Sequence, residues 1–171
     1  MRGVLIVSFS VLAMLALLAL GCNSEPGDEG ADLNASLPVN TENIVYSFPG
    51  IFSLESEAVP AYFYNVRQGS VLKAPYSGKV SLSNLPSGAM QITISGRSMD
   101  VSLVVYQLSE LGVREGRAVK SGSAIGIVGN AIPGEETNLV MFAVDKSTGS
   151  YMDLSSNPNM VYKAPPKRSA P

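Results

Sequence analysis

Side chains able to do chemistry are few in this sequence, and histidine is missing from all 171 residues. A serine–histidine–aspartate or cysteine–histidine arrangement therefore cannot be built. One cysteine, Cys22, excludes a cysteine pair for a metal, and no glycine-rich phosphate loop opens a helix. A serine–lysine pair is conceivable, but nothing places one in a buried pocket that would lower a lysine pKa. Its candidate members are Lys73, Lys79, Lys120, Ser121 and Ser123. The residues alone assign no catalytic group, no metal and no cofactor.

Cys22 stands directly after a long apolar segment. Residues 1–21 contain one early cation, Arg2, and an apolar run over 4–20, which is typical of a signal peptide. Small residues before the cysteine resemble the lipobox of bacterial lipoproteins, and the resemblance implies cleavage after Gly21 and acylation of Cys22, with palmitate as a typical chain. A lone thiol in an exported protein is a liability unless something consumes it. The alternatives are an ordinary signal peptide or an uncleaved membrane anchor, with Cys22 incidental.

The charge of the remaining chain limits its partners. Removing residues 1–21 removes only Arg2, which leaves 11 Lys and Arg against 14 Asp and Glu, a net charge of −3. A mildly acidic chain lacks the basic patch that nucleic acid or anionic lipid requires. We therefore expect no nucleic-acid partner and a membrane contact that rests on acyl chains. The expected location is the cell membrane or outer membrane, facing the periplasm or the cell exterior.

Composition divides the rest of the chain into three parts. Residues 22–40 are rich in Asn, Ser, Gly, Pro and acidic residues, which predicts a flexible tether. Residues 41–163 hold enough Val, Ile, Leu and aromatic side chains for one core and not two. Residues 164–171 form a short Pro-rich tail that we expect to be disordered.

The periodicity of residues 41–163 predicts an all-β fold. Apolar and polar residues alternate over 90–95, and the run 101–106 is apolar on both faces, as in a central strand. Pro49-Gly50 and Gln68-Gly69 indicate turns. Val113, Val119 and Ile125 recur every six residues, with Gly116 and Gly122 at the same step, which indicates short β-segments joined by tight turns with positive φ. The tyrosines of the first strands fit a stacking platform or, as we prefer, packing on a sheet; they are Tyr46, Tyr62 and Tyr64.

Several of these segments, in this order, resemble the lysostaphin/LytM-type zinc endopeptidase domain. The likeness spans roughly residues 59–160 and implies a compact β-barrel or sandwich with a duplicated hybrid motif. The segments that carry it are the glycine-spaced run from Val113 to Gly126, the strand 139–144, and the shorter pieces Leu72–Pro75, Val105–Ser109 and Tyr151–Asp153.

The departures from that family concern the metal site. By resemblance, the family holds zinc with two histidines and an aspartate, and a further histidine activates the bound water. The corresponding positions here are Val59 and Phe63 for the H-x-x-x-D element, Gln107 for the Y-x-H-L element, and Leu139 and Met141 for the H-L-H-F-E-V strand. None of these side chains is a zinc ligand. We therefore expect a degenerate, non-catalytic member in which Gln107, Leu139 and Met141 meet in the former groove, as filled core or as a shallow binding slot.

A second architecture shares the glycine spacing. The lipoyl/biotinyl-type hybrid motif also resembles this pattern, but carriers present a lysine at a hairpin tip. The candidate hairpin here, Asn84 to Met90, has none. The flanking helical hairpins of adaptor proteins are not visible either.

Three functions remain open at this point. The first is a lipid-anchored, inactive peptidase homologue that recruits or activates a peptidoglycan hydrolase or binds the wall peptide. The second is a structural envelope lipoprotein whose β domain docks in another assembly. The third is an active cell-wall metalloendopeptidase.

Overall fold

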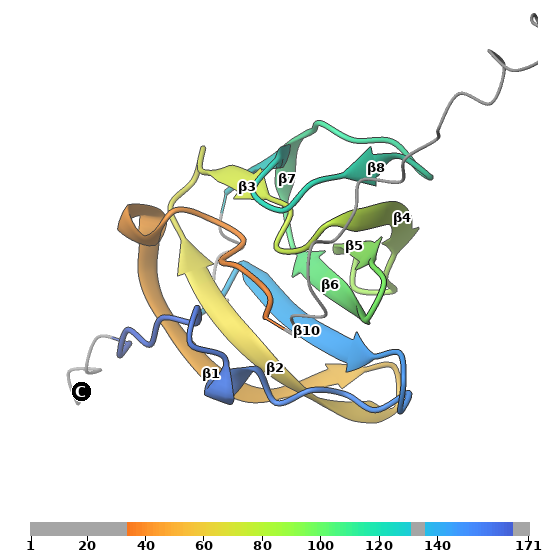
Figure 1. Ribbon diagram of the computed structural model, residues 1–171. Coiled ribbons are helices and arrows are strands. Elements are labelled where there is room, and N and C mark those ends of the chain that lie inside the picture. The colour runs from red at the N-terminus through yellow and green to blue at the C-terminus, as the bar shows by residue number, and fades with distance from the viewer. Residues whose placement is uncertain (1–33, 131–135, 166–171) are drawn as a thin grey trace, which may run out of the picture.

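Two antiparallel β-sheets make up the fold in the computed structural model, which describes residues 34–130 and 136–165 (Figure 1). The larger sheet has seven strands, in the order β1 (Ile44–Leu54), β2 (Glu57–Val66), β10 (Leu139–Asp145), β6 (Met99–Val105), β5 (Met90–Ser95), β4 (Gly78–Asn84) and β8 (Ala118–Val119). The smaller sheet has three, in the order β3 (Val71–Lys73), β9 (Ala124–Val128) and β7 (Leu108–Leu111). Two single 3-10 turns, η1 (Thr41–Asn43) and η2 (Leu154–Ser156), are the helical elements of the described part. The prediction of an all-β fold is confirmed.

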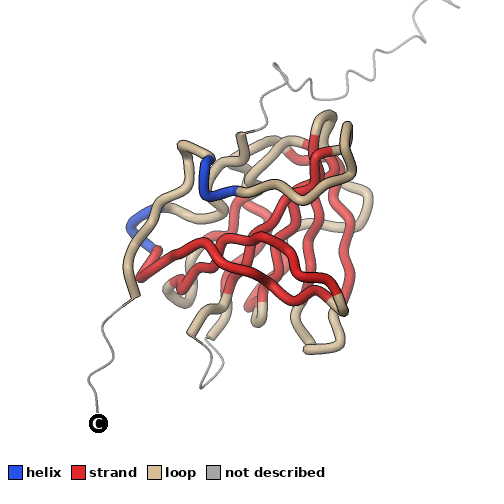
Figure 2. The backbone as a smooth tube through the Cα atoms, turned by 90° about the horizontal axis from the view of Figure 1, so that it is seen from below, coloured by secondary structure: helices blue, strands red, loops and turns tan. Residues whose placement is uncertain are grey.

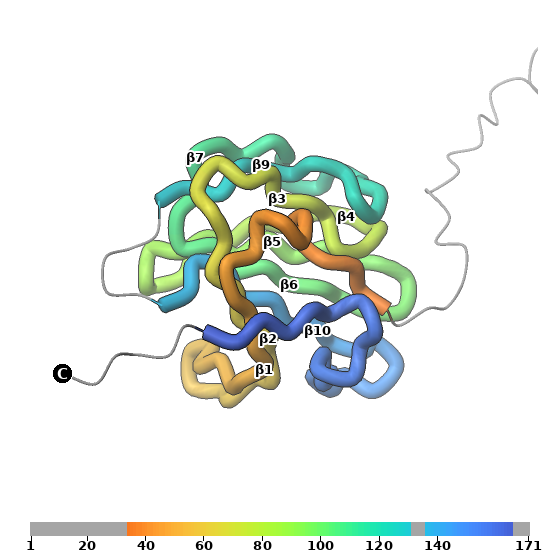
Figure 3. Tube along the Cα trace, turned by 90° about the vertical axis from the view of Figure 1, so that its left-hand side faces the viewer, coloured from red at the N-terminus to blue at the C-terminus, as the bar shows by residue number. Residues whose placement is uncertain are grey.

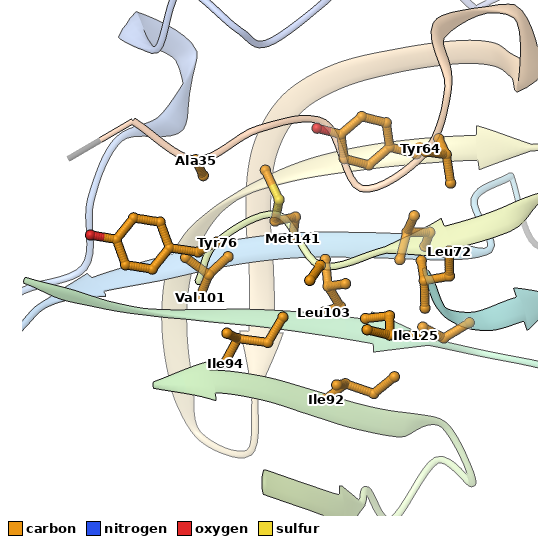
Figure 4. Close-up of a cluster of buried hydrophobic side chains, with 14 of the residues drawn as sticks. Ala35, Tyr64, Leu72, Tyr76, Ile92, Ile94, Val101, Leu103, Ile125 and Met141 are labelled. Atoms are coloured by element: carbon orange, nitrogen blue, oxygen red, sulfur yellow. The ribbon is translucent and has the colours of Figure 1, made fainter. Parts of the chain in front are cut away.

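The smaller sheet lies as a separate layer over the larger one (Figure 3). We call the face of the seven-stranded sheet that meets it the inner face, and the opposite face the outer face. Ile92, Leu103 and Met141 on the inner face pack in one buried cluster with Leu72 of β3 and Ile125 of β9 (Figure 4). Each of these five side chains is fully buried, so this layer supplies most of the apolar burial that stabilises the fold.

Most of the expected strands are present. Strand β5 covers the predicted alternating segment, with Ile92 and Ile94 fully buried. Strand β6 is the fourth of the seven strands and is buried on both faces, as predicted for a central strand. Gly116 and Gly122 have φ of 75° and 82°, as the tight turns require.

The prediction of a turn at Pro49-Gly50 is wrong. Both residues lie inside β1, and the chain reverses at Glu55 and Ser56, between the paired residues Leu54 and Glu57. Strand β1 is at the edge of its sheet, and an edge strand tolerates proline because the missing N–H can face away from the ladder. The result is a long hairpin of 11 and 10 residues, whose strands lie side by side in Figure 1. Figure 2 shows the described chain as strands joined by loops, with two short helical turns.

The last seven residues of the predicted tether, 34–40, are described by the structure and are ordered. Residues 34–40 are part of the folded domain: Ala35 and Val39 are buried in the main core, and Ala35 lies among its side chains in Figure 4. The Ser36 amide donates to the Pro75 carbonyl at 2.8 Å, and the Asn157 side chain donates to the Ala35 carbonyl at 3.0 Å. Composition predicted a flexible segment because residues 22–40 as a whole are rich in Asn, Ser, Gly, Pro and acidic residues. Burial of Ala35 and Val39, together with the backbone hydrogen bonds, is enough to hold residues 34–40 in the fold.

The C-terminal segment closes the structure along β1. Ser47 and Lys163 exchange two backbone hydrogen bonds of 2.9 and 3.0 Å, and the Lys163 ammonium donates to the Thr41 and Ile44 carbonyls. Ala164 and Pro165 follow, exposed. The rest of the predicted tail, the signal peptide and Cys22 lie outside the described residues. Within the described ranges, no helix is long and apolar enough to span a membrane.

Candidate functional site on the outer face

Leu139 and Met141, two of the predicted site positions, belong to the interior. Both side chains of β10 point to the inner face and are fully buried in the main core. They therefore share a face, as a period of two requires, and they are plain core residues. Met141 lies among the apolar side chains between the sheets in Figure 4.

The other three positions lie elsewhere. Val59 and Phe63 of β2 belong to a second apolar cluster on the outer face, and Gln107 is exposed just past the end of β6. The expectation that Gln107 meets Leu139 and Met141 is wrong, because Gln107 is outside the core that holds the other two. The five positions do not converge, since the sheet itself separates Leu139 and Met141 from Val59 and Phe63.

Two residues that the sequence comparison did not single out stand beside Val59 and Phe63. Strand register pairs Val140 directly with Phe63, and Phe142 follows on the same face of β10. Val140 and Phe142 each follow one of the expected positions, Leu139 and Met141, by one residue. Neighbouring residues of a strand point to opposite faces, so this offset of one residue places them on the other side of the sheet. The sequence of β10 does not show which of its residues face outward, because it is apolar at both alternating sets of positions. The pairing with β2 shows it.

A continuous row of residues crosses the outer face. It runs through six strands, and each member is the register partner of the next: Phe48, Phe63, Val140, Val104, Gln91 and Ser83. The first four residues are apolar and lie on β1, β2, β10 and β6, whereas the last two are polar and lie on β5 and β4. The outer face thus has an apolar half and a polar half.

Aromatic rings dominate the apolar half. The rings of Phe48 and Phe63 are stacked with centroids 5.5 Å apart, and Phe52 lies 6.4 Å from Phe63 and 6.1 Å from Phe142. Tyr151 meets Phe142 edge-on at 6.1 Å. Val140 and Val104 beneath them are fully buried. Hydrocarbon therefore fills this part of the outer face. Its base is buried, whereas the rings of Phe48, Phe52, Phe63 and Tyr151 remain partly exposed.

The polar half carries small hydroxyl and amide groups. Thr93 and Ser102 are hydrogen-bonded at 2.8 Å, and the Gln91 amide nitrogen donates to both hydroxyls at 3.3 Å. Further along the same strands Ser95 donates to Asp100, which forms an ion pair of 3.3 Å with Lys146.

The tip of the β1–β2 hairpin leans over this face. Leu54 at the tip and Leu85 in the β4–β5 loop belong to the same outer-face cluster, although their strands stand at opposite sides of the sheet. The Tyr151 hydroxyl donates to the Glu57 carboxylate at 2.9 Å. That hydrogen bond, with burial as a smaller cause, raises the pKa of Tyr151 above its ordinary value.

Two members of the candidate serine–lysine set have other hydrogen-bond partners. The Lys73 ammonium donates to the Asn40 side chain, and Ser121 is hydrogen-bonded to Ser36. Tyr62 and Tyr64 are buried on the inner face, so they pack on the sheet as preferred. Burial raises the pKa of the Tyr64 phenol far above its ordinary value.

Solved structures of other proteins share this architecture. The catalytic domain of lysostaphin from Staphylococcus simulans superposes with a TM-score of 0.50 at 18% sequence identity, over 64% of this chain and 90% of that one. A chain of the SpoIIQ–SpoIIIAH pore-forming complex gives 0.50 at 18%, over 70% and 87%. Csd3 from Helicobacter pylori gives 0.52 at 17%, over 76% and 36%. The fold is lysostaphin-like.

At these identities the likeness is one of fold. No protein-family model matches the sequence, and no curated protein matches it either. A lysostaphin-like fold is also the architecture that the resemblance in the glycine-spaced segment implied, so that expectation is confirmed.

The lysostaphin-like sheet of this chain does not fit a zinc ion. Zinc is bound by thiolate, imidazole or carboxylate groups, and a catalytic site needs three of them. Nowhere in residues 34–130 or 136–165 do three His, Cys, Asp or Glu side chains stand close enough to hold a metal. The outer face instead presents hydrocarbon at Val59, Phe63, Val140 and Phe142.

Proposed function

We propose that this protein is a non-catalytic binding module of the bacterial cell envelope, built on a lysostaphin-like fold. The observation that carries the proposal is the outer face of the larger sheet, where Val59, Phe63, Val140 and Phe142 form an apolar cluster without a metal-binding side chain. The absence of histidine from the sequence supports it, because two histidines are the family's strand ligands. An apolar surface without metal ligands favours binding over metal-dependent hydrolysis as the use of the scaffold.

The partner we propose is a peptidoglycan hydrolase, which the module recruits or activates, with wall peptide as the competing ligand. One chain with this fold occurs in a complex of two proteins, SpoIIQ and SpoIIIAH. That example supports the use of a lysostaphin-like domain in protein assembly. A role as a structural lipoprotein in another assembly is the alternative.

The attachment we propose is a lipid at Cys22, since small residues precede this cysteine directly after the apolar segment. Growth of the expressing bacterium with an alkyne-labelled palmitate should label the wild-type chain and not Cys22→Ser. Equal labelling of both chains would remove the anchor from the proposal.

Catalysis is tested on the purified protein after incubation with zinc and dialysis. Elemental analysis should find zinc well below one equivalent, and dye-labelled sacculi should release no dye, with the lysostaphin catalytic domain as the positive control. Stoichiometric zinc together with dye release would mean that the domain is an enzyme.

Partner choice is tested by adding the protein to purified cell-wall amidases. We expect faster dye release than with the amidase alone, and co-purification of the two proteins. Binding to sacculi without any effect on an amidase would favour wall peptide. Failure of both would favour the structural alternative.

A further inference from the structure

A mixed polar and apolar pocket lies at the border between the two halves of the outer face. Its volume is about 450 Å³, within the range of roughly 300–1,000 Å³ typical of small-molecule sites. Leu54 and Glu55 of the hairpin tip form one wall, and Leu85 and Pro86 of the β4–β5 loop form the other. A second hollow of about 300 Å³ shares these four residues and continues toward Phe52 and Tyr106.

Hydrogen-bonding groups line the larger pocket. They are the carboxylates of Glu55 and Glu57, the amides of Asn84 and Gln91, the hydroxyls of Ser56 and Ser83 and the phenol of Tyr151. Among the described residues no lysine or arginine lines either hollow. A phosphate or carboxylate ligand would meet like charge without a counter-ion, and a hydrocarbon would leave the polar groups without partners.

Some of these groups are held in place before any ligand arrives. The hydrogen bond from Tyr151 to Glu57 and the edge contact with Phe142 fix the Tyr151 ring. Gln91 donates through its nitrogen to Thr93 and Ser102, which leaves its carbonyl oxygen for a donor in the pocket. Pre-positioned groups reduce the ordering that binding requires.

Glu55 occupies its place at a conformational cost. It is the one non-glycine residue of the described part with positive φ, at 54°, where glycine or asparagine is less strained. Its side chain borders both hollows. The two-residue hairpin turn at Glu55 and Ser56 requires this positive φ, and the turn thereby sets Glu55 at the lip of the pocket.

We propose that this pocket binds one sugar unit of a neutral oligosaccharide, with the adjoining hollow for the next unit. Sugar hydroxyls would donate to the Glu55 and Glu57 carboxylates and the Gln91 carbonyl, while the apolar faces of the rings pack on Tyr151, Leu54 and Pro86. This proposal rests on the proposed function in one respect only: a role in the cell envelope makes a wall glycan the natural source of the sugar. Soluble oligosaccharides test the pocket by itself.

The experiment is a calorimetric and NMR titration of the full chain in a zwitterionic detergent without a sugar headgroup. Chitotetraose and cellotetraose are the sugar probes, and tetralysine tests the alternative that the two carboxylates select an ammonium group. We expect at least one sugar to bind at millimolar concentration, with amide shifts confined to residues 52–57, 83–91, Tyr106 and Tyr151.

Variants assign the binding to the pocket. Gln91→Leu and Tyr151→Ala should weaken the sugar's affinity about tenfold or more, because each removes a hydrogen bond or a ring contact. Gln107→Leu and Tyr162→Ala change an exposed Gln and Tyr outside the pocket and should leave it unchanged. Gln91→Leu keeps the test decisive if Tyr151→Ala fails to fold.

Three outcomes would overturn the proposal. They are no response to either sugar, shifts on another surface, or tetralysine binding in place of sugar. Sugar binding by a chain that has no effect on amidases or sacculi would instead retain the pocket and reject the proposed function, so the two failures are distinguishable.

Discussion

Asn138 shows how much a single buried polar side chain contributes to this sheet. Its oxygen accepts from the Val66 amide and its nitrogen donates to the Val66 carbonyl, both at 2.8 Å. The side chain thus extends the pairing of β10 and β2 by one step, at the end where the two strands meet. That pairing sets Val140 opposite Phe63 and so determines which residues of β10 reach the outer face.

Replacement of Asn138 by alanine should destabilise the domain by about 3 kcal/mol, since two buried backbone groups lose their partners at roughly 1–3 kcal/mol each. Urea denaturation followed by circular dichroism measures the change. Asn130→Ala, at an exposed asparagine, is the control and should differ little from wild type. Equal stability of the two variants would show that water replaces the Asn138 contacts.

The two hairpins that flank the outer face are the elements that shape the site. Residues Leu54–Glu57 and 84–89 approach each other across the sheet, and the pocket lies between them. The β4–β5 hairpin depends on a close backbone approach at Gly78: a Cβ there would lie 2.4 Å from the Ser95 carbonyl oxygen and 2.8 Å from the Gly96 nitrogen. Glycine is required here for space.

Gly78→Ala should therefore push β4 away from β5 and destabilise the domain by about 3 kcal/mol, the upper end for overpacking. Hydrogen exchange of the β5 amides should accelerate more than that of β2. Ser83→Ala, at an exposed position of the same strand, is the matched control. An unchanged exchange pattern in Gly78→Ala would mean that the backbone shifts without loss of pairing.

At the scale of the whole molecule, the folded domain begins earlier than composition predicts. Residues 34–40 cross the main core and are held by the C-terminal segment through Asn157 and Asn159, which both donate to the Ala35 carbonyl. The two ends of the described chain therefore stabilise each other, and any membrane tether is correspondingly shorter.

A chain that begins at Thr41 should be less stable than one that begins at Asn34 by about 2–4 kcal/mol, because buried Val39 alone contributes roughly 1.5–3 kcal/mol. Thermal melting of the two chains under the same conditions measures the difference. Coincident melting curves would place residues 34–40 outside the cooperative unit.

The sequence by itself determined the fold class, because alternation over 90–95, the doubly apolar run 101–106 and the turns at Gly116 and Gly122 are local patterns. It also determined that no histidine is available to bind a metal. It misplaced the turn at Pro49-Gly50, since a Pro-Gly pair indicates a turn unless, as here, the strand lies at a sheet edge.

Only the tertiary structure decided what surrounds the five positions expected from the resemblance. A strand's sequence shows that alternate residues share a face, but not which face meets the second sheet, because that depends on pairing with distant strands. The β10–β2 register assigned Leu139 and Met141 to the core and Val140 and Phe142 to the outer face. The pocket between Leu54 and Leu85 is likewise a product of packing between segments about 30 residues apart, which no local pattern encodes.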